Sequence, residues 1–149
     1  MQYRLLGKLL LFAALALAAL AVRAENAQDF GDYVVHYNAL TTDMIPPEVA
    51  RQYGIKRSKS RAMLNIVVLK KIMGTGTEPM TARVTASATN LTGQKKRIDL
   101  RLIREAHAIY YIGEFGISNQ ETLDFDIEVT PEGSKQPLHV RFRHEFFTN

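Results

Sequence analysis

The chain alternates between polar and apolar residues in Thr122-Leu123-Asp124-Phe125-Asp126-Ile127-Glu128-Val129-Thr130, turns at Pro131-Glu132-Gly133-Ser134, and alternates again from Leu138 to Phe147. A period of two is the spacing of a β-strand with one buried face. Pro and Gly in the intervening segment mark a turn. The stretch therefore predicts an antiparallel hairpin whose apolar side chains all face one core.

The charged residues of this hairpin predict its register. If the connection is symmetric, the outward side chains pair as Asp124 with Arg143, Asp126 with Arg141, and Glu128 with His139. Opposite charges across neighbouring strands stabilise a sheet by about 0.2–1 kcal/mol per pair. We expect a solvated ladder of charges that fixes the register, and not an ion-binding face.

The same period continues toward the N-terminus. Five further segments read as strands: Asp32 to Leu40, Ala62 to Ile72, Met80 to Asn90, Lys96 to Glu105 and Ala108 to Ile117. In the fourth of these, Ile98, Leu100 and Leu102 are expected to face inward. The segment from Ala62 is apolar on both parities, which is typical of a strand covered on both faces. About seven strands separated by turn signals predict an all-β, immunoglobulin-like antiparallel β-sandwich.

One segment breaks the alternation. Pro46 to Gly54 has Pro at its start and Gly at its end, which predicts a short helix between the first two strands. A basic run overlaps this helix and follows it, comprising Arg51, Lys56, Arg57, Lys59 and Arg61. Long irregular connections often carry function. This run is therefore the candidate binding site, with a solvated loop as the alternative.

The N-terminus has the three parts of a secretory signal. Arg4 and Lys8 precede the uncharged apolar stretch Leu9 to Val22, and Val22-Arg23-Ala24 offers a cleavage pattern. The 14 apolar residues rise about 21 Å as a helix, short of the roughly 30 Å of a bilayer core. We expect residues 1–24 to be a signal peptide cleaved after Ala24, residues 25–149 to form one domain, and no transmembrane anchor to remain.

Charge and cysteine content exclude several functions. The chain has 19 Lys and Arg against 15 Asp and Glu, but Arg4, Lys8 and Arg23 leave with the signal, so the rest is close to neutral. A nucleic-acid binder needs a strong basic surface. The chain has no cysteine, which excludes thiol catalysis and disulfides. The four His residues are scattered, and no metal or cofactor is expected.

The strongest acid/base candidate is the group Glu105, His107 and Tyr111. These residues share one strand parity if the strand continues through Ala106. A carboxylate beside an imidazole can orient a general base. The sequence has no nucleophile motif to act with this group, so we assign no catalytic residue. The alternative is that the three are ordinary polar residues at a strand edge.

Several segments together resemble a known family. They are Pro47-Glu48-Val49-Ala50, Tyr53-Gly54-Ile55, Asn90-Leu91-Thr92-Gly93-Gln94-Lys95-Lys96, Ile103-Arg104-Glu105, Tyr110-Tyr111-Ile112-Gly113-Glu114-Phe115, Glu121-Thr122-Leu123-Asp124-Phe125 and Arg141-Phe142-Arg143-His144-Glu145-Phe146-Phe147. In order and spacing they are similar to a family of small exported proteins of Gram-negative proteobacteria, catalogued only as a domain of unknown function. The resemblance implies a periplasmic single-domain protein and supplies no activity.

The sequence thus favours a periplasmic, non-enzymatic binding or protein-interaction domain. Its expected partner is a periplasmic protein or an anionic surface of the envelope, met by the basic run. Two alternatives stay open. One is an enzyme of unrecognised class that uses Glu105, His107 and Tyr111. The other is a chaperone-like module that adds a strand from a partner to an exposed sheet edge.

Overall fold

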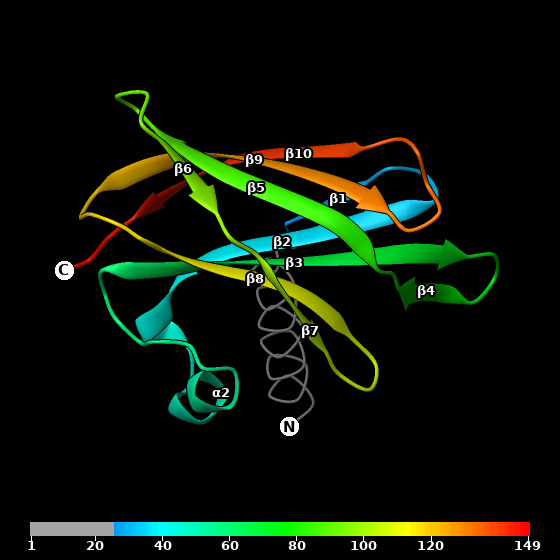
Figure 1. Cartoon of the computed structure of the whole chain (residues 1–149), viewed down its shortest axis with the longest axis horizontal. Coiled ribbons are helices and arrows are strands. Elements are labelled where there is room, and N and C mark those ends of the chain that lie inside the picture. The colour runs from blue at the N-terminus through cyan, green and yellow to red at the C-terminus, as the bar shows by residue number, and fades with distance from the viewer. Residues whose placement is uncertain (1–25) are drawn as a thin grey trace, which may run out of the picture.

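The computed structural model describes residues 26–149, which form two antiparallel sheets packed face to face (Figure 1). The strands are β1 (Ala27–Asp29), β2 (Tyr33–Thr41), β3 (Arg61–Ile72), β4 (Gly76–Pro79), β5 (Ala82–Asn90), β6 (Lys95–Ile98), β7 (Arg101–Arg104), β8 (Ile109–Gly116), β9 (Glu121–Pro131) and β10 (Leu138–Phe146). Sheet A has the order β1-β2-β3-β8-β7, with β4 also paired to β3, and sheet B has the order β10-β9-β5-β6. The predicted all-β sandwich is confirmed.

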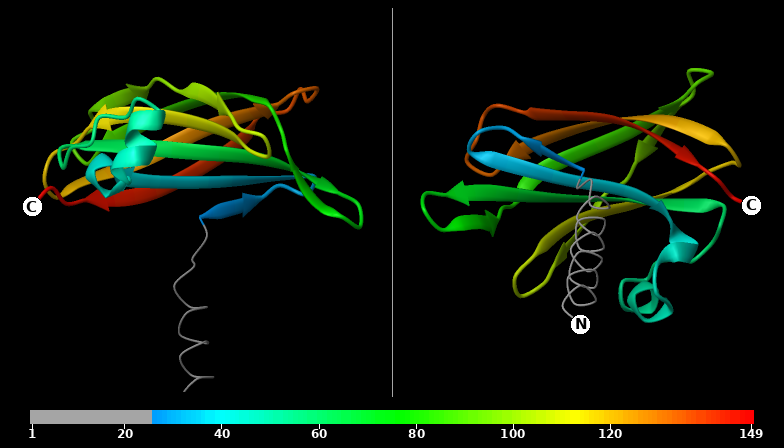
Figure 2. Two further views of the ribbon diagram at one scale, coloured as in Figure 1. Left: turned by 90° about the horizontal axis from the view of Figure 1, so that it is seen from below. Right: turned by 180° about the vertical axis from the view of Figure 1, so that it is seen from behind.

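A linker of residues 42–60 joins β2 to β3. It contains the 3-10 helix η1 (Thr42–Met44) and the short helix α2 (Pro47–Gln52), as expected from the Pro and Gly signals. The linker lies on the side of sheet A that faces away from sheet B (Figures 1 and 2). Neither helix in the described part of the chain has the length and hydropathy needed to cross a bilayer. The expected signal peptide, residues 1–24, lies outside the described residues.

The hairpin of β9 and β10 has the predicted register. Asp124 pairs with Arg143, Asp126 with Arg141, and Glu128 with His139. The Arg143 guanidinium donates to both carboxylate oxygens of Asp124, at 2.6 and 2.8 Å, which holds the pKa of that carboxyl below its usual value. Polar residues alternate with buried ones along β9, as the period of two in the sequence predicted.

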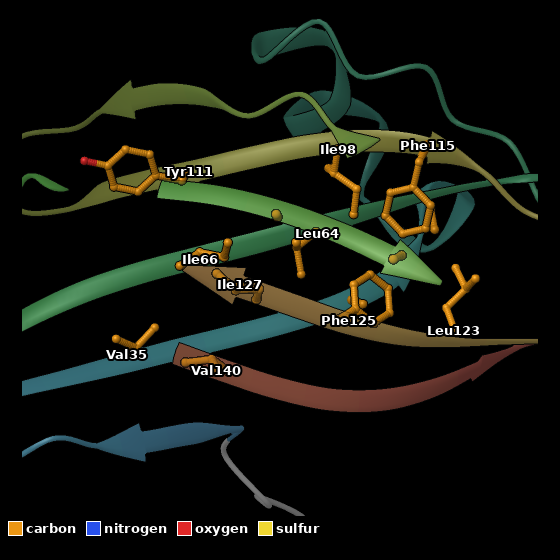
Figure 3. Packing of buried hydrophobic residues seen from close by; sticks show 14 of the residues in the cluster. Val35, Leu64, Ile66, Ile98, Tyr111, Phe115, Leu123, Phe125, Ile127 and Val140 are labelled. Carbon is orange, nitrogen blue, oxygen red and sulfur yellow. The ribbon is translucent and has the colours of Figure 1, made fainter. Parts of the chain in front are cut away.

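The main core lies between the two sheets, with Phe115 and Phe125 toward one end of it (Figure 3). Phe125 stacks on Phe142 with ring centroids 4.5 Å apart, and its edge meets Phe115 at 5.8 Å. Leu64 and Ile66 of β3 enter from sheet A and are fully buried. Inward residues of seven strands thus share one hydrophobic cluster.

The structure corrects the strand count. Strands β1 and β4 have three and four residues, too short to show a period in the sequence. The strand expected from Lys96 to Glu105 is divided in two: β6 pairs with β5 in sheet B, and β7 pairs with β8 in sheet A. The change of sheet at Asp99 and Leu100 resets which side chains face the core. The inward placement of Leu102 was therefore wrong, and its side chain is 41% exposed.

Glycine makes this change of sheet possible. The chain passes over β8 at Gly113, where an added Cβ would lie 2.5 Å from Ile98 Cγ2 and 2.8 Å from the Asp99 carbonyl oxygen. Cβ atoms do not approach backbone that closely. Gly113 is therefore required for the crossing from β6 to β7.

We expect Gly113→Ala to destabilise the protein by about 1–3 kcal/mol, the usual cost of overpacking a tightly packed site. Gly116→Ala is the matched control, because it lies on the same strand and a Cβ there meets no atom within 4 Å. Urea unfolding of both variants measures the difference. Equal midpoints for the two variants would contradict the role given to Gly113.

Candidate functional site

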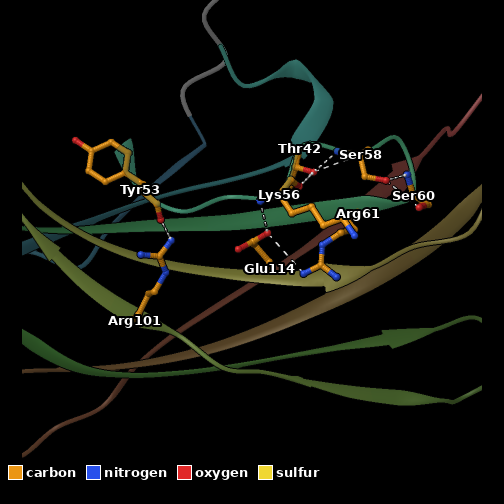
Figure 4. Close-up of polar contacts among 8 residues, drawn as sticks. All are labelled: Thr42, Tyr53, Lys56, Ser58, Ser60, Arg61, Arg101 and Glu114. Carbon is orange, nitrogen blue, oxygen red and sulfur yellow. Dashed lines mark hydrogen bonds and ion pairs between the residues drawn. The ribbon is translucent and has the colours of Figure 1, made fainter. Parts of the chain in front are cut away.

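The linker is held to sheet A by its own polar contacts. Thr42 is fully buried, and its hydroxyl oxygen accepts a hydrogen bond from the Ser58 amide at 2.9 Å. The same hydroxyl lies within donating distance of two carbonyl oxygens, of Lys56 at 2.8 Å and of Ser58 at 3.1 Å (Figure 4). One buried side chain thus satisfies the backbone where the linker returns toward β3.

Arg57 fixes the other end of the linker. Its Nε donates to the Ile45 carbonyl oxygen at 2.7 Å, and its Nη2 donates to the Asp43 carbonyl oxygen at 2.6 Å. Both acceptors lie at or next to η1. The guanidinium therefore replaces backbone pairing that this irregular segment lacks.

Between the linker and sheet A lies an apolar pocket of about 230 Å³. This linker pocket is lined by Ile45, Val49, Tyr53 and Ile55 of the linker and by Met63, Asn65, Ile103, Tyr110 and Ile112 of the sheet. Several of these residues form a hydrophobic cluster separate from the main core. Small-molecule pockets are typically apolar with a few placed polar groups.

Asn65 contributes a carboxamide to the lining of the linker pocket. Its Oδ1 is buried and has no hydrogen-bond partner within residues 26–149. Buried polar atoms are normally paired, because an unpaired one costs about 1–3 kcal/mol. The Asn65 carboxamide therefore offers an unused polar contact inside an apolar pocket.

Tyr53 lines the pocket and is held at both ends, and we call the part of the pocket at this residue its mouth. Its hydroxyl donates to the Glu105 carboxylate, which raises the pKa of the phenol above its usual value. Its carbonyl oxygen accepts a hydrogen bond from Arg101 Nη2 (Figure 4). Both partners come from the region of β7, so the strand at the edge of sheet A positions the mouth.

The five residues of the basic run predicted as a binding site differ in their contacts. Arg57 is occupied as described, and Arg61 Nη2 lies 3.5 Å from the Glu114 carboxylate. Arg51 faces Glu48 at 3.9 Å, and both side chains are highly exposed. Among the five, only Lys56 and Lys59 have exposed ammonium groups without an ion pair inside the described range.

The acid/base group is not assembled either. Tyr111 faces the main core, and its hydroxyl accepts a hydrogen bond from the Ala82 amide at 2.7 Å. Glu105 instead faces the linker through Tyr53, on the other side of sheet A. His107 is exposed in the turn between β7 and β8. The shared parity assumed a continuous strand, and the turn at Ala106 and His107 breaks it.

A second hollow lies on the outer face of sheet B, among polar and charged residues that include Lys95, Arg97, Asp126 and Arg141. Arg141 and Asp126 bind each other there, with Nε and Oδ2 3.1 Å apart. No group of three or more His, Asp or Glu residues in the described chain is arranged to hold a metal ion. This face is the predicted ladder of paired charges.

Sequence reasoning missed Asn65, Arg101, Ile103 and Tyr110 as site residues. One signal for them was present, since apolar residues on both parities of β3 predicted a second covered face. The partner strands on that face were not predictable, because β7 was not recognised as a separate strand.

Comparison with known protein families gives a match over nearly all of the described residues. The family model described as "Domain of unknown function (DUF4426)" matches residues 27–149. The crystal structure of a DUF4426 family protein from Pseudomonas aeruginosa PAO1 is similar, with a TM-score of 0.72 and 36% sequence identity, covering 86% of this chain and 98% of that one. No curated protein matches the chain.

A more distant structure shares the fold. FetP from uropathogenic E. coli strain F11, recombinantly expressed in the periplasm of E. coli BL21(DE3), is similar with a TM-score of 0.58 and 10% identity. The match covers 81% of this chain and 92% of FetP. At this identity the likeness concerns the sandwich alone.

Arg57 and Lys59, two cations of the basic run, are expected to differ in their effect on stability. We expect Arg57→Ala to lower the free energy of unfolding by about 1–3 kcal/mol, because it leaves the carbonyls of Ile45 and Asp43 without their donor. Lys59→Ala, an exposed neighbour, should change it by less than about 0.5 kcal/mol. Urea unfolding monitored by circular dichroism measures both. A larger effect of Lys59→Ala than of Arg57→Ala would refute the assignment.

Proposed function

This chain belongs to the DUF4426 family, and we propose that it is an exported periplasmic module that binds an apolar group of its ligand in the linker pocket. The resemblance to a proteobacterial family of unknown function, predicted from the sequence, is confirmed by these matches. The observation that carries the proposal is the pocket itself, apolar and lined from both the linker and sheet A.

The size and lining of the pocket support binding. An apolar cavity of about 150 Å³ is large enough to hold benzene, and the linker pocket measures about 230 Å³. Each methylene group that leaves water for such a site contributes about 0.8 kcal/mol.

The two rival functions have less support. The enzyme hypothesis needs Glu105, His107 and Tyr111 together, and Tyr111 faces the opposite side of sheet A from Glu105. The strand-addition hypothesis needs a long uncharged edge. The edge strand β10 is nine residues long, but Arg141, Arg143 and Glu145 project from it, and such charges protect edges from pairing.

Export is tested on the protein in its native cells. We expect it in the osmotic-shock fraction with Glu25 as its first residue, because cleavage follows Ala24. N-terminal sequencing of the protein from that fraction is the measurement, and replacing Ala24 with a bulky residue is the control that should retain the precursor. Full-length protein in the cytoplasmic fraction would disprove export.

Binding is tested with the neutral apolar dye N-phenyl-1-naphthylamine, whose fluorescence rises in apolar surroundings. We expect the wild-type protein to enhance the fluorescence, and Val49→Glu to weaken dye binding at least about tenfold, since the pocket cannot hold an unpaired charge cheaply. Val49 is 38% exposed, so the variant should fold. Leu91→Glu, at a residue 70% exposed on the turn after β5, is the matched control and should bind like wild type.

Two results would contradict the binding proposal. One is no fluorescence enhancement by the wild-type protein. The other is equal dye affinity in Val49→Glu and Leu91→Glu, which would place the dye outside the linker pocket. Circular dichroism of each variant reports whether the fold is retained.

A further inference from the structure

We propose that the ligand of the linker pocket is a single-chain amphiphile with a carboxylate head, and that Arg101 binds the head while the chain enters the pocket. The inference rests on the proposed binding function and specifies the chemistry of its ligand. It is carried by the strand register on the outer face of sheet A and by the contacts of Arg101.

The register places Arg101 beside the pocket. Asn65 of β3 is paired with Ile112 of β8, and Ile112 is paired with Arg101 of β7. Directly paired residues of antiparallel strands project from the same face. Neighbouring strands are about 4.8 Å apart, so the Arg101 Cα lies about 5 Å from that of Ile112 and about 10 Å from that of Asn65. One cross-strand row thus runs from the polar residue in the pocket, through its apolar lining, to a cation.

The Arg101 guanidinium has donors to spare. Its Nη2 donates to the Tyr53 carbonyl oxygen, which fixes the side chain at the mouth. A guanidinium carries five N–H donors, and no Asp or Glu within residues 26–149 forms an ion pair with Arg101. The residue is also exposed. A carboxylate suits such a group because it accepts two parallel hydrogen bonds from it.

The other charges around the mouth leave this position open. Glu105 binds the hydroxyl of Tyr53, at the far end of that side chain from the carbonyl that Arg101 contacts. Glu114, on the same face of β8 as Ile112, is engaged by Arg61 at 3.5 Å and by the Lys56 amide. Glu48 faces Arg51 on the exposed side of α2. The cation that adjoins the apolar lining is therefore free to meet an anion from the ligand.

The pocket volume suits an alkyl chain. At about 230 Å³ it accommodates several carbons while the head stays at the surface. Such a ligand could be a free amphiphile or a lipid that stays in a bilayer. The structure favours the free amphiphile, because the pocket lies beneath the linker and a bilayer lipid would have to withdraw its chain from the membrane to enter it. A bilayer lipid is the outcome that the experiment must exclude.

The experiment measures displacement of N-phenyl-1-naphthylamine by decanoate and by decanol, below their aggregation concentrations. We expect decanoate to displace the dye from wild-type protein at least about tenfold more effectively than decanol, and Arg101→Gln to lose that preference. Arg104→Gln is the matched control: it removes an exposed cation on the same strand and should behave like wild type. The preference is read as the ratio of decanoate to decanol displacement within each variant, and circular dichroism reports whether Arg101→Gln retains the fold.

Each outcome decides between the two proposals. Equal displacement by decanoate and decanol, with dye binding that depends on Val49, overturns the carboxylate proposal and leaves the binding function standing. A preference for decanoate that survives in Arg101→Gln also overturns it. Cosedimentation with phosphatidylglycerol vesicles, lost in Arg101→Gln, identifies a membrane surface and overturns the free amphiphile. No dye binding in wild type removes both proposals.

Discussion

The rest of the structure depends on one constraint: β3 lies inside sheet A and is apolar on both faces. Leu64, Ile66 and Val68 are fully buried against sheet B, so Met63 on the opposite face needs a second cover. The linker between β2 and β3 supplies it. An irregular segment has backbone groups that no sheet or helix satisfies, and here the buried Thr42 hydroxyl and the Arg57 guanidinium satisfy some of them. The linker pocket is the space that this cover leaves unfilled.

The same constraint explains why some basic residues of the linker are engaged by the fold itself. A cation near an irregular backbone is as useful to the fold as to a ligand, and Arg57 is used by the fold. Arg61 is likewise engaged with Glu114. Arg101 also donates to the linker, but it forms no ion pair within residues 26–149 and its register places it beside the pocket lining. Its position becomes visible only when β7 is seen to pair with β8.

Features that follow from the local period of apolar residues were predictable from the sequence. Strand pairing was not predictable where the chain moves from one sheet to the other. The β9–β10 register was predictable because a symmetric turn and a period of two leave one arrangement that keeps Phe125 and Val140 buried. The double apolar parity of β3 likewise predicted a second covered face. Nothing in the period between Lys95 and Arg104 reveals that the chain moves from sheet B to sheet A at Asp99. Consequently Leu102 was placed inward, Glu105 was aligned with Tyr111, and Arg101 was missed.

The linker and sheet A are expected to contribute differently to ligand specificity. Burial of an alkyl chain contributes about 0.8 kcal/mol per methylene and hardly distinguishes one chain from another. Discrimination must come from polar groups held in fixed positions, because a ligand that leaves them unpaired loses their hydrogen bonds. The Arg101 guanidinium has no acidic partner within residues 26–149, belongs to sheet A and lies in one cross-strand row with Ile112 and Asn65 of the pocket lining. The linker can therefore vary in sequence to change the volume of the pocket, while the sheet keeps the spacing that selects the head of the ligand.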